Sequence, residues 1–229
     1  MALRVWFISV TNPPETEMTR DTDAQPLALH GPVPSPALLA QLEAYWRVLR
    51  GARAIPARTD VDPAAIDAVL PHAFVAERVA PGVARIRVAG QRLSALFGME
   101  PRGMPLCALF TAAARERLMP LVASTFDGPA IVEMPVEAAR GLLRGRMSGR
   151  MILLPLSDAG GEVNRVIGAI LCDGAPGRSP VRFALPEGRV RVEPVALPDP
   201  LIAPRLAAVG ERRRTAPARP ALRLVVSNG

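Results

Sequence analysis

Few side chains in this sequence combine the residue type and the spacing that catalysis or metal binding requires. The two cysteines, Cys107 and Cys172, stand far apart and form no C-x-x-C pair, so we expect neither a metal site nor a disulfide framework. The only histidines are His30 and His72, and no G-x-S-x-G segment or Cys/His arrangement is present to supply an activated nucleophile. The sequence therefore predicts a protein that is not an enzyme and holds no metal.

Charged residues between positions 133 and 150 suggest two further kinds of site. Glu133 and Glu137 lie four residues apart on one face of a predicted strand, and a solvated sheet edge explains them more simply than paired-carboxylate chemistry. Four positive charges follow: Arg140, Arg144, Arg146 and Arg150. A solvated basic loop is the favoured interpretation, with an anion or phosphate site as the alternative. Residues 141–145 lack the Lys-Ser/Thr ending of a phosphate-binding P-loop.

The C-terminal part of the chain carries nearly all of the net charge. Of the formal charge of +7, residues 174–229 contribute +6, with ten arginines against four acidic residues. A basic tail can bind nucleic acid, but residues 184–229 contain no aromatic side chain on which bases could stack. The short apolar run at 222–226 could add a strand to a sheet edge. We therefore rank nucleic-acid binding by the tail below the two hypotheses that follow from the folded domain.

Chain length and proline distribution predict one folded domain between two flexible ends. Of the 25 prolines, six fall in residues 1–36 and nine in residues 174–229, and such stretches rarely pack. We expect a flexible leader over 1–34, a folded domain over 35–173 and a flexible tail over 174–229. Translation could start at Met1 or at Met18. No apolar run approaches the roughly 20 residues that span a bilayer, so we expect a cytoplasmic protein.

The elements that must position any site follow from apolar spacing and from breakers. An amphipathic helix is predicted over 36–50, and a short helix begins at Asp62 and Pro63. Two strands are expected next, at 74–79 and 83–89. Helical segments follow at 91–97 and from Thr111, with one turn over 106–110 between them, and three strands at 131–138, 150–156 and 163–172 complete the folded region. Pro135 places its strand at an edge or bulge. This order predicts an α+β fold with a single antiparallel sheet of about five strands, helices on one face and an amphipathic N-terminal helix.

Tyr45 and Trp46 are adjacent on the first predicted helix. Neighbouring residues point about 100° apart around a helix, so one ring can pack on the sheet while the other faces a partner. Both are therefore candidates for a partner or dimer contact, and plain core packing is an equal alternative.

Several short motifs across the folded region carry a resemblance to a known family. They are Tyr45-Trp46, Leu49-Arg50-Gly51, the segment 55–63, Leu70-Pro71-His72, the segment 87–93, Leu96-Phe97-Gly98, Gly103, Pro155-Leu156 and Gly168. Over about residues 38–172 the chain resembles a family of short, stand-alone bacterial PAS-like proteins formerly of unknown function. The resemblance implies a PAS fold that senses a small molecule or relays a signal by docking to partners, and it implies no particular ligand.

The cofactors that PAS domains can hold are not expected here. Haem needs an axial ligand, and His30 lies in the leader while His72 lies at a helix stop. Flavin photosensors of this fold use a reactive cysteine in a Gly-Arg-Asn-Cys-Arg-Phe-Leu-Gln segment. Cys107 occupies a similar place, but the spacing is one residue longer and the flavin-holding Asn, Arg and Gln are missing. We therefore expect neither haem nor flavin.

The leading hypothesis is a non-catalytic PAS-type sensor that binds an unidentified small molecule or relays a signal through protein contacts. Strand and helix faces predict the lining of its cavity: Val88, Leu93, Phe97, Leu109, Leu118, Leu154 and Ile170. The alternative is a pure protein-interaction adaptor whose cavity is filled by its own side chains. The partner in either case could be another protein or a second copy of this chain.

Overall fold

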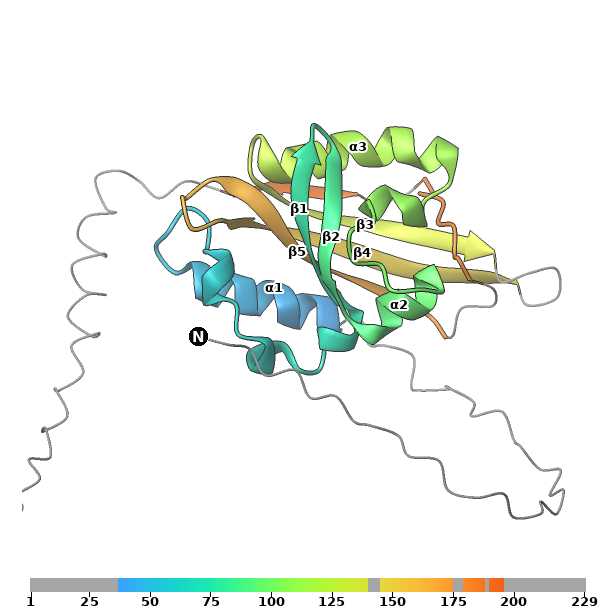
Figure 1. Cartoon of the computed structure of the whole chain (residues 1–229), viewed down its shortest axis with the longest axis horizontal. Coiled ribbons are helices and arrows are strands. Elements are labelled where there is room, and N and C mark those ends of the chain that lie inside the picture. Colours follow the sequence, from blue (N-terminus) through green and yellow to red (C-terminus); the bar gives the residue numbers. More distant parts are fainter. Residues whose placement is uncertain (1–36, 140–144, 175–178, 188–189, 196–229) are drawn as a thin grey trace, which may run out of the picture.

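The computed structural model describes residues 37–139, 145–174, 179–187 and 190–195. Its helices are α1 (Ala37–Arg50), α2 (Gln91–Phe97) and α3 (Ala112–Phe126), with 3-10 turns η1 (Arg58–Asp60), η2 (Pro63–Ile66), η3 (Leu70–His72) and η4 (Leu106–Leu109). Its strands are β1 (Ala73–Ala80), β2 (Val83–Ala89), β3 (Ala130–Ala139), β4 (Arg146–Ser157), β5 (Val163–Cys172) and β6 (Arg191–Pro194). They form one antiparallel sheet in the order β2-β1-β5-β4-β3-β6 (Figure 1). The predicted α+β class is confirmed, with six strands in place of about five.

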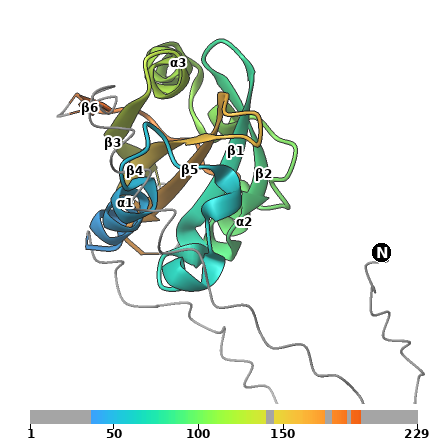
Figure 2. The same ribbon diagram turned by 90° about the vertical axis from the view of Figure 1, so that its left-hand side faces the viewer.

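The sheet is covered on both faces because its central strands bury both sets of side chains. Along β4, Met151 and Leu153 pack with α2, η4 and α3, while Ile152 and Leu154 pack with α1. Figure 2 shows the sheet between α3 and α1. The amphipathic N-terminal helix thus supplies the second layer, opposite the face that carries the other helices.

Helix α1 is fixed to the sheet by its apolar face and by one long-range hydrogen bond. Leu39, Leu42 and Trp46 are buried, and the Trp46 indole Nε1 donates to the Pro155 carbonyl at 2.7 Å. The helix ends at Gly51, whose φ of +54° is a left-handed conformation that glycine adopts readily. The sequence pattern therefore identified this element correctly.

The predicted hairpin forms as expected, and two of the other predicted elements differ in detail. Strands β1 and β2 meet at Gly82, with φ +68°, and the Thr111 hydroxyl accepts from the Ala114 amide to cap α3. The short helix predicted from Asp62 is instead two 3-10 turns, η2 and η3, with Asp62 capping Ala64. Predicted strand 150–156 starts earlier, at Arg146.

Pro135 lies at a gap in the pairing along the outer side of β3. Strand β6 pairs only with the first part of β3, up to Glu133. The Glu137 amide donates to the Ala184 carbonyl at 3.0 Å, and amides two residues apart on a strand point the same way. The missing N–H of Pro135 therefore faces the interval between these two pairings, which agrees with the predicted edge or bulge position.

The folded region extends past the predicted boundary at 173. Val181, Phe183 and Leu185 are buried, and the Phe183 ring packs against Phe110 with centroids 5.9 Å apart. Strand β6 then adds to the sheet edge. The sequence did not predict this extension for two reasons. The prolines around it indicated a flexible tail, and isolated apolar residues and a four-residue strand show little periodicity. The predicted leader over 1–34, His30 and the segment after 195 lie outside the described residues.

The outer side of β2, at the other edge of the sheet, is partly hydrogen-bonded by a loop. The Ile86 amide donates to the Met104 carbonyl at 2.9 Å, and the Gly103 amide donates to the Ile86 carbonyl at 2.8 Å.

Within the described part of the chain, no helix has both the length and the apolar character needed to cross a membrane.

Replacing Trp46 should loosen the second layer. We expect Trp46→Ala to lower the free energy of unfolding by about 3–5 kcal/mol, and Trp46→Phe by about 1–2 kcal/mol because the hydrogen bond to Pro155 is lost. Urea denaturation followed by circular dichroism measures both. Val48→Ala, on the exposed side of α1, is the control, and an equal loss in that variant would contradict the role given to Trp46.

Candidate ligand-binding pocket

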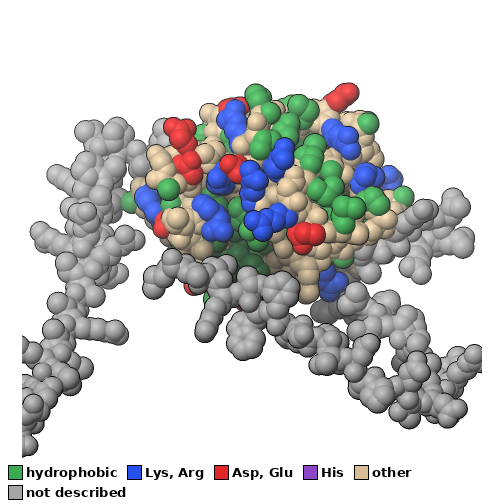
Figure 3. All heavy atoms as spheres, in the orientation of Figure 1, with side chains coloured by type: hydrophobic (Ala, Val, Ile, Leu, Met, Phe, Trp, Pro, Cys, Tyr) green, Lys and Arg blue, Asp and Glu red, His purple; other side chains and the backbone are tan. Residues whose placement is uncertain are grey.

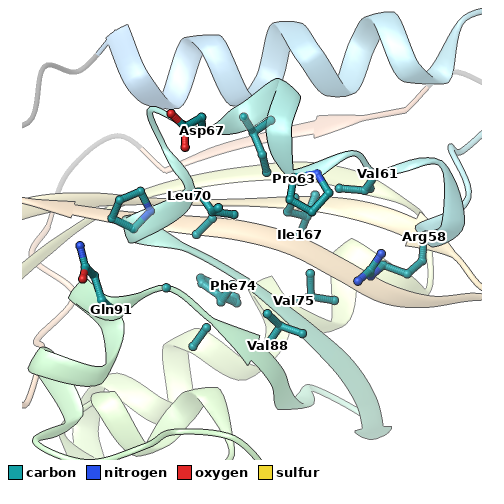
Figure 4. Close-up of a pocket in the computed structure, with 15 residues that line it drawn as sticks. Arg58, Val61, Pro63, Asp67, Leu70, Phe74, Val75, Val88, Gln91 and Ile167 are labelled. Atoms are coloured by element: carbon teal, nitrogen blue, oxygen red, sulfur yellow. The ribbon is translucent and has the colours of Figure 1, made fainter. Parts of the chain in front are cut away.

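A pocket of about 500 Å³ lies on the α1 side of the sheet, where β1 and β2 extend beyond α1 (Figure 4). One wall is the sheet itself, with Val75, Val88 and Ile167. The opposite wall is the segment 58–72, which we call the roof and which carries η1, η2 and η3. Ligand pockets in proteins commonly measure 300–1,000 Å³, so this one has room for a small molecule.

The middle of the pocket is apolar because both walls present aliphatic side chains. From the roof come Val61, Pro63, Ile66 and Leu70. Transferring a polar group into such a lining without a hydrogen bond costs free energy, so the lining favours an apolar occupant.

Polar groups occur toward the ends of the pocket. In Figure 4, Arg58 lies at one end, and Asp67 and Gln91 lie toward the other. The roof is attached to α1 by the Tyr45 hydroxyl, which accepts from the Asp62 amide at 2.8 Å. These polar groups were not singled out from the sequence, because charged residues in a loop give no sign of which cavity they face.

Gly90 sets the close approach at the Gln91 end of the pocket. Its amide donates to the Ala73 carbonyl at 2.8 Å. A Cβ at position 90 would lie 2.2 Å from the Leu70 carbonyl oxygen and 2.4 Å from that of Pro71. Only glycine lets the roof rest on the start of α2 at this point.

The structure separates the seven residues predicted to line a cavity. Val88 lines the pocket and is 52% exposed. Five are buried in the core between the sheet and α2, η4 and α3: Leu93, Phe97, Leu109, Leu118 and Ile170. Leu154 packs on the opposite face, beneath α1. The seven do not line one space, because the alternation along a strand defines two faces without showing which one borders a pocket.

The two predicted partner contacts differ in accessibility. Trp46 is 1% exposed and packs in the core, so it presents no surface to a partner while α1 lies on the sheet. Tyr45 is half-buried, with its hydroxyl on the roof. A partner role for Tyr45 stays a prediction.

His72 and the cysteines form no site of their own in the described residues. Burial lowers the pKa of His72 below its usual value. A hydrogen bond with the Ile170 backbone acts in the opposite direction, and the nearby Arg92 lowers the pKa further. Cys107 and Cys172 are not joined to each other by a disulfide. Over the ranges that the structure describes, no group of three or more His, Cys, Asp or Glu side chains could hold a metal ion.

The glutamates and arginines near β3 and β4 form ion pairs with one another. Arg150 donates to Glu133 at 2.6 Å, and Arg146 lies 3.3 Å from Glu137. Arg140 and Arg144 lie outside the described residues. The described members of the predicted basic cluster are therefore engaged across the strands. Figure 3 likewise shows blue arginine and red acidic side chains intermixed on one face of the molecule.

A second group of ion pairs connects β6 to α1. Arg191 contacts Glu43 and lies 3.0 Å from both Glu133 and Glu193, and Arg47 lies 2.7 Å from Glu43 and 2.6 Å from Glu193. Burial alone would raise the pKa of Glu43, but the hydrogen bonds from Arg191 and Arg47 lower it below its usual value.

The comparisons with known proteins agree with this architecture. A family model described as a PAS domain matches residues 35–171. The chain belongs to the PAS domain family. PAS domains are generally non-catalytic sensor or interaction modules of signalling proteins. A search of curated proteins found no match to this chain.

Adding one methyl group at Gly90 should disturb the pocket. We expect Gly90→Ala to lower the free energy of unfolding by about 1–3 kcal/mol, because the new Cβ would force the roof away from α2. Thermal unfolding checks this. Gly128→Ala is the matched control, since nothing lies within 4 Å of a Cβ there. Equal stability of the two variants would contradict the proposed close approach.

Glu43 should make the free energy of unfolding depend on pH in the acid range. Because its pKa is lower in the folded chain, its contribution is complete above its usual value of 4.5 and is lost as pH falls through the folded pKa. We expect Glu43→Gln to flatten the acid limb of a plot of unfolding free energy against pH. Exposed Glu116 supplies the control, Glu116→Gln, which should keep the wild-type slope. An unchanged slope in Glu43→Gln would refute the assignment.

Proposed function

We propose that this PAS domain is a non-catalytic sensor that binds a small molecule in the pocket beneath the roof. The observation that carries the proposal is the apolar space of about 500 Å³ between the roof and strands β1, β2 and β5. Catalysis would need a nucleophile or an acid–base pair in this space, and the lining offers mainly aliphatic side chains.

The roof is a suitable element for relaying occupancy. It consists of short 3-10 turns, whose hydrogen bonds are weaker than those of an α-helix. Tyr45 and the Arg53–Asp60 ion pair connect it to α1 and to the loop after α1. A ligand that repositions the roof would therefore change the surface around the end of α1, where Val48 is 80% exposed. That surface is where we place contacts with a protein partner or a second copy.

A pure interaction adaptor is the second candidate, favoured by exposed apolar side chains at the pocket mouth. Leu70 is 37% exposed and Val88 is 52% exposed, and both line the pocket. An apolar side chain of a partner protein could fill the same space without any small molecule.

Nucleic-acid binding by the basic tail remains third, and its residues beyond 195 lie outside the described ranges. It predicts an affinity that falls steeply with salt and is lost on truncation after residue 195. For the sensor proposed above, we also propose a cytoplasmic location.

Native mass spectrometry of the purified full-length protein, with a denatured run beside it, tests the sensor proposal. We expect excess mass that is lost on denaturation. Val88→Phe should reduce the occupied fraction about tenfold or more, because the larger ring fills the mouth of the pocket. Val79→Phe is the control, since Val79 is 44% exposed on the same hairpin and does not line the pocket.

Protein without excess mass after expression in several hosts would favour the adaptor. Equal loss of bound mass in both variants would show that the ligand occupies another place.

A further inference from the structure

The charge arrangement of the pocket carries an inference about the chemical class of its ligand. We infer that the occupant is an amphipathic carboxylic acid, with an apolar body beneath the roof and its single carboxylate paired with Arg58. This inference rests on the proposed function, since it concerns the same pocket.

Arg58 is held at one end of the pocket by the turn that it begins. Its carbonyl accepts from the Val61 amide at 3.3 Å, and the Arg58 and Val61 side chains both line the pocket. Figure 4 shows the guanidinium directed toward the space between roof and sheet. The backbone of one 3-10 turn thus places a cation beside an apolar surface.

The carboxylates nearest to Arg58 in the sequence are already engaged. Asp60 pairs with Arg53, and the Asp62 side chain accepts from the Ala64 amide at 2.9 Å. Within the described ranges, no acidic side chain forms an ion pair with Arg58. A guanidinium in this situation can donate two parallel hydrogen bonds to a carboxylate of a ligand.

The rest of the lining limits the ligand to one charge. Val61, Val75 and Ile167 line the middle, where a second charged group would be desolvated without a partner. Toward the far end, Asp67 repels an anion and Gln91 offers neutral hydrogen bonding. The pocket is therefore polarised along its length, and an acid binds in one orientation.

A single arginine also favours a carboxylate over a phosphate monoester. A phosphate ester carries between one and two negative charges at pH 7, and its three oxygens are usually held by several donors. Among the described lining residues, Arg58 is the one cationic side chain. One planar guanidinium matches one planar carboxylate in both charge and shape.

Calorimetric titration of the full chain with three probes of equal length tests the inference: decanoic acid, decan-1-ol and decylamine. We expect the acid to bind about tenfold more tightly than the alcohol, and the amine to bind most weakly. Where the purified protein carries a ligand, the same three compounds are compared as competitors that displace the bound mass.

Variants of Arg58 separate the charge from the apolar contacts. Arg58→Gln should bring the acid to the affinity of the alcohol and leave the alcohol unchanged, whereas Arg58→Lys should keep a preference for the acid. Arg85→Gln, at an exposed arginine of β2 that does not line the pocket, is the control and should match the wild type.

Two results would overturn the inference while the pocket remains a ligand site. One is equal binding of acid and alcohol by the wild type, and the other is a preference for the acid that survives Arg58→Gln. Absence of binding by all three probes, together with absence of bound mass, would overturn both the inference and the proposed function.

Discussion

The central strands of the sheet impose the main constraint on this structure, because β4 and β5 bury side chains on both faces. A sheet of this kind needs a layer on each side. Helices α2 and α3 cover one face, and α1 covers the other, where the Trp46 indole reaches the Pro155 carbonyl. The position of α1 along the sheet then decides which strands remain for the roof to cover.

The pocket is a consequence of this incomplete cover. Helix α1 packs against the β4 side of the sheet, and the roof returns along β1 and β2 in 3-10 turns of three or four residues, which are too short to present a continuous apolar stripe. At one end, Gly90 lets the roof lie close to the start of α2. Between these attachments the aliphatic side chains of the two walls are separated by a space that a ligand can enter.

Much of the fold could be predicted from local patterns, but the site could not. The helix 37–50 and the strand 83–89 follow directly from apolar periods of 3.6 and 2 residues. Strand β6 was missed because four residues after a proline-rich stretch give too short a pattern. The seven residues predicted to line a cavity lie mostly on the α3 face, with Leu154 beneath α1, because alternation along a strand does not reveal which face a helix leaves uncovered. Nothing in the sequence around Arg58 marks it as a pocket residue, since a charged residue in a loop does not show that the neighbouring carboxylates are engaged elsewhere.

The hydrogen bonds that residues 103 and 104 make to Ile86 also determine how copies of this protein can meet. An exposed sheet edge invites strand addition, which is a common route to aggregation and domain swapping. Here the middle of β2 is already paired by that loop, and the opposite edge is formed by β6, a strand of only four residues. Among the described residues, neither edge presents a long template for a continuous intermolecular sheet. A partner or a second copy would then have to bind the helical and roof surfaces, where side chains rather than backbone groups would select it.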